Sequence, residues 1–338
     1  MKNKKIFFTL PHNNPSGGVK VVNEFVNLCR EKGYESFLCL PSDEVKLATF
    51  LNNSAPVKSL YEMIKLSTSE DYIICCWQSK DEVHAVKKSK AKLKVLWQHG
   101  ILIPNTNKDV GDLIYKEKIF NKYANVSHSC GIYIKNKYNL DKMHTINPFF
   151  EINRKEIIKE NERNGFLILA RRGSEYIPKI KNELKNLNQS LTILYEPYKN
   201  NHFINLLKIH KYFISIDNGL NYSLSWKEKL KGKKLNWIKH DKNYLGFPVP
   251  PLEAALTKTI VIGFAMGGGL EWMNSECLFL AKDNDINDLI QQIHKAIMTD
   301  KLTISSMQEE ACRKAEFFNK ENSWKQLINI LEIKDNDK

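Results

Sequence analysis

Residues 244–273 read YLGFPVPPLEAALTKTIVIGFAMGGGLEWM, and several structural signals follow one another in this stretch. Residues 246–251 form a stiff turn that closes on a proline pair, and residues 252–256 predict the start of a helix. Pro251 suits a place near the first helical residue, because the first N–H groups of a helix have no intrahelical partner. Residues 259–264 are a short β-branched run, which predicts a buried parallel strand.

A run of three glycines, Gly267, Gly268 and Gly269, follows the predicted strand and leads toward a further helix. If the preceding helix and strand belong to an open parallel sheet, this loop leaves the carboxyl end of the strand. Such sheets bind ligands at that edge. Glycine lets a ligand approach the backbone closely, and N–H groups at a helix start bind anions. The run therefore predicts a phosphate-binding loop, with an ordinary turn as the alternative.

The stretch resembles the donor-binding signature of retaining glycosyltransferases of family 4, which have the GT-B fold. In that family the C-terminal domain carries a pattern close to E-G-F-G-L-P-P-L-E-A, then a strand, a Gly-Gly loop and a Glu. Two positions depart from it, because the family's first Glu falls on Leu245 and its second Gly on Pro248. The residues that match the pattern in order are Gly246, Phe247, Pro250, Pro251, Leu252, Glu253, Ala254, Gly267, Gly268 and Glu271.

Composition sets bounds on the class of protein. The chain has 338 residues, 42% of them hydrophobic, which predicts a globular protein of two domains. Its seven cysteines show no metal-ligand spacing, which is typical of reduced thiols in a cytoplasm. No run approaches the ~18 apolar residues of a membrane span. Residues 6–10 are too short for the core of a signal peptide and predict a first strand.

The formal net charge is +13, which favours anionic partners such as nucleic acid, acidic lipid or a phosphorylated substrate. The chain is also rich in Lys and Asn throughout, so the charge has a second explanation in the base composition of its gene. The densest basic run, residues 227–234, predicts a solvated face. No nucleic-acid-binding signature accompanies it, so we expect no nucleic-acid partner.

Strand-like and helix-like stretches alternate along the chain, which predicts parallel α/β architecture. We expect a Rossmann-like acceptor domain over residues 1–150 and a linker over residues 151–164. A Rossmann-like nucleotide-sugar-binding domain would follow over residues 165–318, with the two sheets facing a central cleft. The resemblance implies that a C-terminal helix within residues 319–338 crosses back to the first domain. Strands are predicted at residues 36–40, 72–77, 94–97, 165–170, 191–195, 211–216 and 235–238, and helices at 19–32, 286–297, 304–318 and 324–333.

The resemblance extends more weakly into the first half of the chain. The family has a Gly-Gly loop after its first strand and often a His after a mid-domain strand. Gly17 and Gly18 occupy the first place, and His99, before Gly100, occupies the second. Taken alone, the glycine pair is typical of a turn, and His99 is typical of a satisfied structural histidine. Their joint order favours the functional interpretation.

Departure of a nucleotide diphosphate requires a cation, and arginine offers a fixed fork of donors. Arg171 follows the first strand of the predicted second domain, where the resemblance places a phosphate-binding Arg. The family's Lys, five residues later, falls on Tyr176, so Arg172 or Lys179 would supply the second charge. A surface arginine pair is the alternative.

Glu253 is expected in the first turn of its helix, where the helix dipole favours a carboxylate in any case. The resemblance implies that it accepts hydrogen bonds from the donor's ribose hydroxyls. For Glu271 a structural role is equally open. The Asp-x-Asp form of Asp283 to Asp285 occurs in metal-dependent transferases, but here it precedes a helix and predicts capping. The same form at residues 335–337 falls in a frayed terminus. No metal site and no cofactor are expected.

The sequence thus predicts a metal-independent retaining glycosyltransferase whose nucleotide sugar is a substrate, with Arg171 and His99 as the catalytic residues. The acceptor would be a glycan, a lipid-linked precursor, or a cell-surface polysaccharide such as lipopolysaccharide or capsule. The expected location is cytoplasmic, with attachment to an anionic membrane surface as a further expectation. Two alternatives stay open: a nucleotide-sugar epimerase of the same fold, and a basic nucleic-acid-binding protein whose only support is charge.

Overall fold

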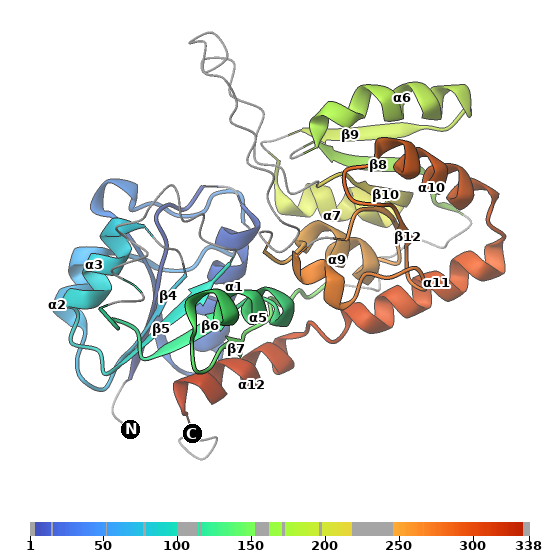
Figure 1. Ribbon diagram of the computed structural model, residues 1–338. Helices are drawn as coiled ribbons and strands as arrows, with labels where there is room; N and C mark the ends of the chain where they lie inside the picture. Colours follow the sequence, from blue (N-terminus) through green and yellow to red (C-terminus); the bar gives the residue numbers. More distant parts are fainter. Residues whose placement is uncertain are drawn as a thin grey trace, which may run out of the picture. The chain divides into compact units, whose positions relative to one another are not determined.

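The computed structural model describes residues 4–14, 16–51, 53–76, 79–99, 114, 117–152, 162–170, 173–195, 198–217, 246–265 and 267–333. The chain divides into two compact units (Figure 1). Unit 1 contains Met1–Glu151 and Phe318–Lys338, and unit 2 contains Ile152–Phe317. Each unit holds one parallel sheet with helices, so the predicted α/β class is confirmed.

Unit 1 is built on a seven-stranded sheet with the order β3-β2-β1-β4-β5-β6-β7. Every neighbouring pair of strands is parallel. The inner strands read as continuous apolar runs because helices cover both faces of such a sheet. The strands are β1 (Lys5–Thr9), β2 (Glu35–Leu40), β3 (Val57–Ser59), β4 (Tyr72–Cys75), β5 (Leu93–Gln98), β6 (Lys122–Asn125) and β7 (His144–Thr145).

Serine residues cap four of the helices that the structure describes in unit 1. Ser16 caps α1 (Gly17–Glu31), and Ser127 caps α5 (His128–Tyr138). Ser59 and Ser79 form capping boxes at the starts of α2 (Leu60–Leu66) and α3 (Lys80–Lys88), each with a glutamate three residues later. A short 3₁₀ helix, η1 (Ser42–Glu44), follows β2. On one sheet face α1 places Phe25 edge-on against Trp97, with ring centroids 4.7 Å apart.

The last helix, α12 (Lys320–Leu331), belongs to unit 1 although unit 2 precedes it in the chain. Its Ser323 hydroxyl donates to the carbonyl oxygen of Asn147 at 2.8 Å. Its Gln326 exchanges hydrogen bonds with the same asparagine at 2.7 Å. Its buried apolar residues are Trp324, Leu327, Ile328, Ile330 and Leu331.

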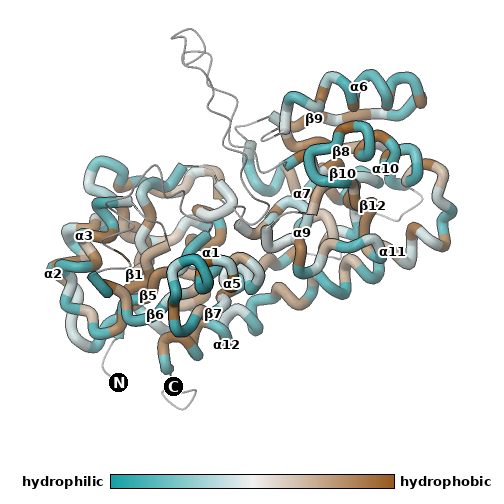
Figure 2. Tube along the Cα trace, in the orientation of Figure 1, coloured by the Kyte–Doolittle hydropathy of each residue, from teal (hydrophilic) through white to brown (hydrophobic). Residues whose placement is uncertain are grey.

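Unit 2 is built on a five-stranded parallel sheet with the order β12-β11-β10-β8-β9. In Figure 2, β8 and β9 are largely brown, the colour of hydrophobic residues, whereas α6 is largely teal. The strands are β8 (Asn164–Ala170), β9 (Leu191–Tyr195), β10 (His210–Ser215), β11 (Ile260–Gly263) and β12 (Phe279–Leu280).

Two sets of helices pack on the sheet of unit 2. One set contributes to a large apolar cluster, and the other contacts β10. The cluster joins strand residues such as Phe166 and Ile214 to helix residues such as Ile180 and Ile293. Helices α7 and α9 contact each other and β10. The helices are α6 (Ile177–Asn186), α7 (Asn200–Ile209), α9 (Val249–Leu256), α10 (Ile286–Met298) and α11 (Lys301–Ala315), with the short 3₁₀ helices η4 (Ser174–Tyr176) and η6 (Gly267–Glu271).

Most predicted elements exist, with shifted ends. The strand predicted at residues 94–97 is β5, and the one predicted at 211–216 is β10. The helix predicted at 324–333 begins earlier, at Lys320, because Asn319 caps it. The strand predicted at residues 235–238 and the basic run at 227–234 lie outside the described residues. No helix in the described ranges is long and apolar enough to cross a membrane.

Candidate functional site

Each sheet has one point where the strand order reverses. Ligands of open parallel sheets bind at the carboxyl ends of the strands at that point. In unit 1 the reversal lies between β1 and β4, and in unit 2 it lies between β10 and β8. A ligand of unit 2 is therefore expected at the carboxyl ends of β8 and β10.

Two glycines flank the carboxyl end of β10. Gly173 has φ +81°, and a Cβ there would lie 1.9 Å from the carbonyl oxygen of Ile216. Gly263 ends β11, and a Cβ there would lie 2.1 Å from the carbonyl oxygen of Ser215. Only glycine permits such close backbone approach. Gly173 and the end of β11 at Gly263 therefore both lie close against the backbone at the carboxyl end of β10.

The predicted glycine loop and the predicted Gly-Phe turn lie side by side. The N–H of Gly268 donates to the carbonyl oxygen of Gly246 at 3.1 Å. A Cβ on Gly269 would lie 3.0 Å from Cγ of Pro248. Gly267, Gly268 and Gly269 are all buried and form the start of η6. Phe247 is half-buried. The structure thus brings together two segments that are separated by a helix and a strand in the sequence.

Glu253 lies deeper in its helix than the sequence suggested. Helix α9 begins at Val249 after Pro248, so Glu253 is the fifth helical residue and no acidic residue stands in the first turn. The prediction that Glu253 occupies the first turn is therefore wrong, because the turn prolines themselves adopt helical geometry. With 2% of its surface exposed, Glu253 is buried. A buried carboxylate needs hydrogen-bond donors around it.

The residues predicted to bind phosphate fall mostly outside the described part. Arg171 and Arg172 lie outside the described residues, and so does Leu245. Lys179 lies on the exposed side of α6, where its Nζ donates to Oδ1 of Asn287 at 2.5 Å. Tyr176, at the family's Lys position, packs against Phe264 with ring centroids 6.1 Å apart.

The acidic candidates separate into clear roles. Asp285 accepts hydrogen bonds from the N–H groups of Asn287 and Asp288 and caps α10, so the capping prediction is confirmed. Glu271 is exposed at the end of η6. Residues 335–337 lie outside the described residues. Within the described ranges, no group of three His, Cys, Asp or Glu residues is arranged to hold a metal ion.

In unit 1 the predicted glycine pair opens a helix. Gly17 and Gly18 are the first two residues of α1, after the capping Ser16. One turn later, the buried Asn23 fixes the loops around this helix start. Its Nδ2 donates to Oδ1 of Asn13 at 3.2 Å, and its Oδ1 accepts from the N–H of Ala55 at 3.0 Å. No sequence pattern indicated Asn23, because its role depends on two loops distant in sequence.

His99 follows β5 directly at the carboxyl edge. Its ring lies edge-on to Trp97, with centroids 4.3 Å apart. Its Nε2 atom is buried and has no hydrogen-bond partner in the described part of the chain. Burial lowers the pKa of His99 to about 3. The imidazole is therefore neutral near pH 7 and presents an unsatisfied polar atom, unlike a satisfied structural histidine.

Glu82 is a buried carboxyl that the sequence analysis missed. It is fully buried at the start of α3, beside the end of β1 where the strand order reverses. Oε1 accepts from the Thr9 hydroxyl at 3.0 Å, and Oε2 accepts from the Ser79 hydroxyl at 2.7 Å. Burial raises the pKa of Glu82 to about 7, against the lowering effect of these hydrogen bonds. The S-x-x-E spacing signals the cap, but not the burial.

Comparison with solved structures identifies the architecture. An alpha-glucosyltransferase in complex with UDP and a 13-mer DNA has 13% sequence identity and a TM-score of 0.65, over 97% of this chain and 99% of that chain. HepE from Anabaena, in complex with UDP and glucose, has 13% identity and a TM-score of 0.68 over the same shares. A glycosyltransferase from Rickettsia africae has 16% identity and a TM-score of 0.65, over 99% of this chain and 100% of that one.

These likenesses define the fold as GT-B, the architecture that the sequence predicted. They extend over nearly the whole chain in each case. At such low identity they establish the fold alone. No protein-family model matches the sequence, and no curated protein matches it.

Proposed function

We propose that this chain is a metal-independent glycosyltransferase that moves a sugar from a nucleotide-sugar donor with retention of anomeric configuration, as family 4 enzymes do. The GT-B fold is compatible with the proposal, and so is the presence of UDP in two of the similar structures. The nucleotide sugar would be a substrate, and no cofactor is required. Unit 2 would bind the donor, and unit 1 would bind the acceptor.

The observation that carries the proposal is the pairing of Gly246 with Gly268. Two segments of the donor-binding signature are joined by a direct backbone hydrogen bond of 3.1 Å. Both lie beside the carboxyl end of β11, next to the end of β10, where Gly263 lets the backbones approach closely. This is the edge of the sheet at which a nucleotide is expected.

Individual roles follow from residue chemistry. Glu253 would accept hydrogen bonds from the ribose hydroxyls, a task suited to an acceptor-only carboxylate. Arg171 would stabilise the departing diphosphate, which is the main catalytic contribution we propose. Because Asn287 holds Lys179, Arg172 is the better candidate for the second positive charge. Gly267, Gly269 and Phe247 would line the donor, and Glu271, exposed at the end of η6, would stand at its margin.

In unit 1, Gly17 and Gly18 would let substrate approach the start of α1. His99 would bind a sugar hydroxyl through its unsatisfied Nε2. Because the ring is neutral, it would contribute a hydrogen bond rather than a positive charge. The acceptor we propose is a glycan, a lipid-linked precursor or a cell-surface polysaccharide of the lipopolysaccharide or capsule type.

Thermal shifts with a panel of nucleotides and nucleotide sugars test the donor proposal, since a ligand that binds the native state raises its stability. We expect UDP or another nucleoside diphosphate to raise the melting temperature. Arg171→Ala should then lower turnover at least ~100-fold, the loss that removal of one charge stabiliser causes. Near-normal turnover would transfer the role to Arg172.

Two further measurements settle the open alternatives. An epimerase would convert the nucleotide sugar without acceptor, whereas a transferase would barely turn over. Acceptor assays should test a glycan, a lipid-linked precursor and DNA. DNA is included because one similar structure contains it.

For location, the net charge of +13 supports a cytoplasmic protein that attaches to an anionic membrane surface. Equal binding to neutral and anionic vesicles at low salt would contradict that attachment.

A further inference from the structure

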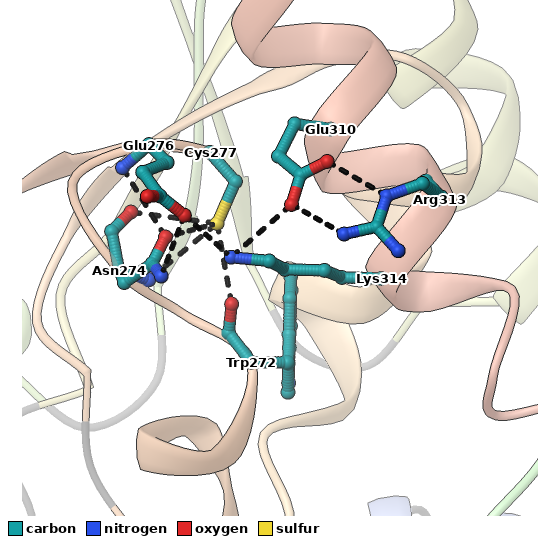
Figure 3. A network of polar contacts seen from close by, with 7 residues as sticks. All are labelled: Trp272, Asn274, Glu276, Cys277, Glu310, Arg313 and Lys314. Carbon is teal, nitrogen blue, oxygen red and sulfur yellow. Dashed lines mark hydrogen bonds and ion pairs between the residues drawn. The ribbon is translucent and has the colours of Figure 1, made fainter.

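A polar network joins helix α11 to the turn that follows the glycine loop (Figure 3). Lys314, near the end of α11, donates to Oε2 of Glu276 at 3.2 Å and lies 3.4 Å from Oε1 of Glu310. Its side chain is only 19% exposed. Arg313 binds Glu310 through two hydrogen bonds, at 2.8 and 2.7 Å, and stays exposed. Lys314 therefore reaches from the helix to the turn.

The turn itself is closely hydrogen-bonded. Asn274 Nδ2 donates to Oε2 of Glu276 at 3.2 Å, and its Oδ1 accepts from the N–H of Glu276 at 3.2 Å. The Cys277 thiol lies 3.2 Å from the carbonyl oxygen of Trp272 and 3.3 Å from Oδ1 of Asn274. The carboxylate that Lys314 binds is therefore fixed to the backbone of residues 272–277.

The same turn is also bonded to the glycine loop. The N–H groups of Trp272 and Met273 donate to the carbonyl oxygen of Gly269 at 3.1 and 2.7 Å. A continuous series of hydrogen bonds thus leads from Lys314 through Glu276, Asn274, the Cys277 thiol and Trp272 to Gly269. Gly269 is the glycine that lies against Pro248, beside the bond from Gly268 to Gly246.

We propose that Lys314 is a positioning residue, which sets the place of the glycine loop through Glu276 and so tunes affinity for the nucleoside diphosphate part of the donor. This inference rests on the proposed function. Exposed ion pairs contribute little to global stability. Glu276 is largely exposed, so we expect its ion pair with Lys314 to add little to stability. The pair matters because it connects helix α11 to the turn at residues 272–277 and so fixes the position of that turn.

The test compares UDP affinity in calorimetry for Lys314→Met, Glu276→Gln and the matched control Arg313→Met. Lys314→Met and Arg313→Met remove the same charge from adjacent positions of α11, but of the two side chains it is Lys314 that donates a hydrogen bond to the turn. We expect Lys314→Met to weaken UDP binding ~10-fold, as misplacement of a binding group does. Arg313→Met should change it little, and Lys314→Arg should restore most of the affinity.

Glu276→Gln separates position from charge. If Lys314 acted only by its long-range charge, removal of the nearby carboxylate would strengthen binding of an anion. Positioning predicts the opposite, weaker binding, and a double variant no worse than the worse single one. The donor KM should rise more than kcat falls.

The same measurements distinguish failure of the proposed function from failure of the positioning role of Lys314. If the wild-type protein binds no nucleoside diphosphate or nucleotide sugar, the proposed function fails. If the wild type binds UDP and both Lys314→Met and Glu276→Gln bind it equally well, or Glu276→Gln binds it more tightly, the positioning role fails. Melting temperatures of the variants within a few degrees of the wild type confirm that the fold is intact.

Discussion

The N–H of Gly268 is bonded to the carbonyl oxygen of Gly246 at 3.1 Å. This bond commits one amide of the glycine loop to the protein itself, so that amide is not available to a diphosphate in this conformation. It also means that the two glycine segments move together. A displacement of the glycine loop should therefore also move the start of α9 and Glu253.

The first prediction concerns Gly173, which directly precedes η4. Gly173→Ala places a Cβ 1.9 Å from the carbonyl oxygen of Ile216 and strains a φ of +81°. Gly33→Ala is the matched control, because its φ is +87° but nothing lies within 4 Å of the added atom. Both variants lose ~1–2 kcal/mol to the left-handed backbone. Only Gly173→Ala adds the steric cost, so urea unfolding should show a clearly larger loss there. Equal losses would mean that the contact with Ile216 relaxes freely.

The second prediction tests the ribose contact of Glu253. Glu253→Gln keeps the volume of this buried side chain but removes the charged acceptor. Loss of a hydrogen bond to a charged group costs ~1.5–3 kcal/mol, which is roughly a 10- to 100-fold rise in Kd for UDP. Calorimetry with UDP and its 2′- and 3′-deoxy forms sharpens the test. The wild type should discriminate against a deoxy form, and the variant should not. Discrimination that survives in the variant would assign the ribose to another residue.

The third prediction concerns the pH dependence of stability. The pKa of Glu82 is raised to about 7 in the fold by burial, above its usual 4.5. Its contribution to stability is therefore complete below about pH 4.5 and is lost as the pH rises through 7. As the pH rises from 4.5 to 7, the free energy of unfolding should therefore fall less for Glu82→Gln than for the wild type.

A second capping box supplies the control for Glu82. Hydrogen bonds from Ser59 lower the pKa of the exposed Glu62. Its contribution is present above its usual pKa and is lost as the pH falls, which is the opposite sign. Glu62→Gln should therefore be less stable than the wild type above this pH, and the difference should disappear in acid. Parallel pH profiles for Glu82→Gln and the wild type would contradict the burial argument.

The fourth prediction concerns His99. Its folded pKa of about 3 lies below the ordinary value of 6.5 because the ring is buried. The unfolded chain takes up the proton first, so stability is complete above pH 6.5 and declines as the pH falls toward 3. His99→Gln should decline less on acidification, and the pH–rate profile of the wild type should show no inflection from this histidine between pH 5 and 8. An inflection that disappears in His99→Gln would show that the ring titrates during turnover.

The sequence predicted local features, such as caps and strands, better than it predicted which residues distant in sequence come into contact. The cap at Asp285 and the strand over residues 260–263 follow from short-range chemistry, and both are present. The start of α9 was misplaced because prolines fit both a turn and a first helical turn. The bond between Gly246 and Gly268, the burial of Glu82 and the two loops held by Asn23 depend on contacts that no periodicity encodes.

The return of α12 to unit 1 has a consequence for how the chain folds as it is synthesised. Domains usually fold in order from the N-terminus. Here the sheet of unit 1 is complete in sequence at β7, but Trp324 and Leu327, which are buried in α12, emerge from the ribosome only after all of unit 2. Unit 2 is contiguous in sequence and can finish first. The N-terminal half would wait, with an apolar surface uncovered, until the last helix arrives, and this makes it the part most dependent on chaperones during translation.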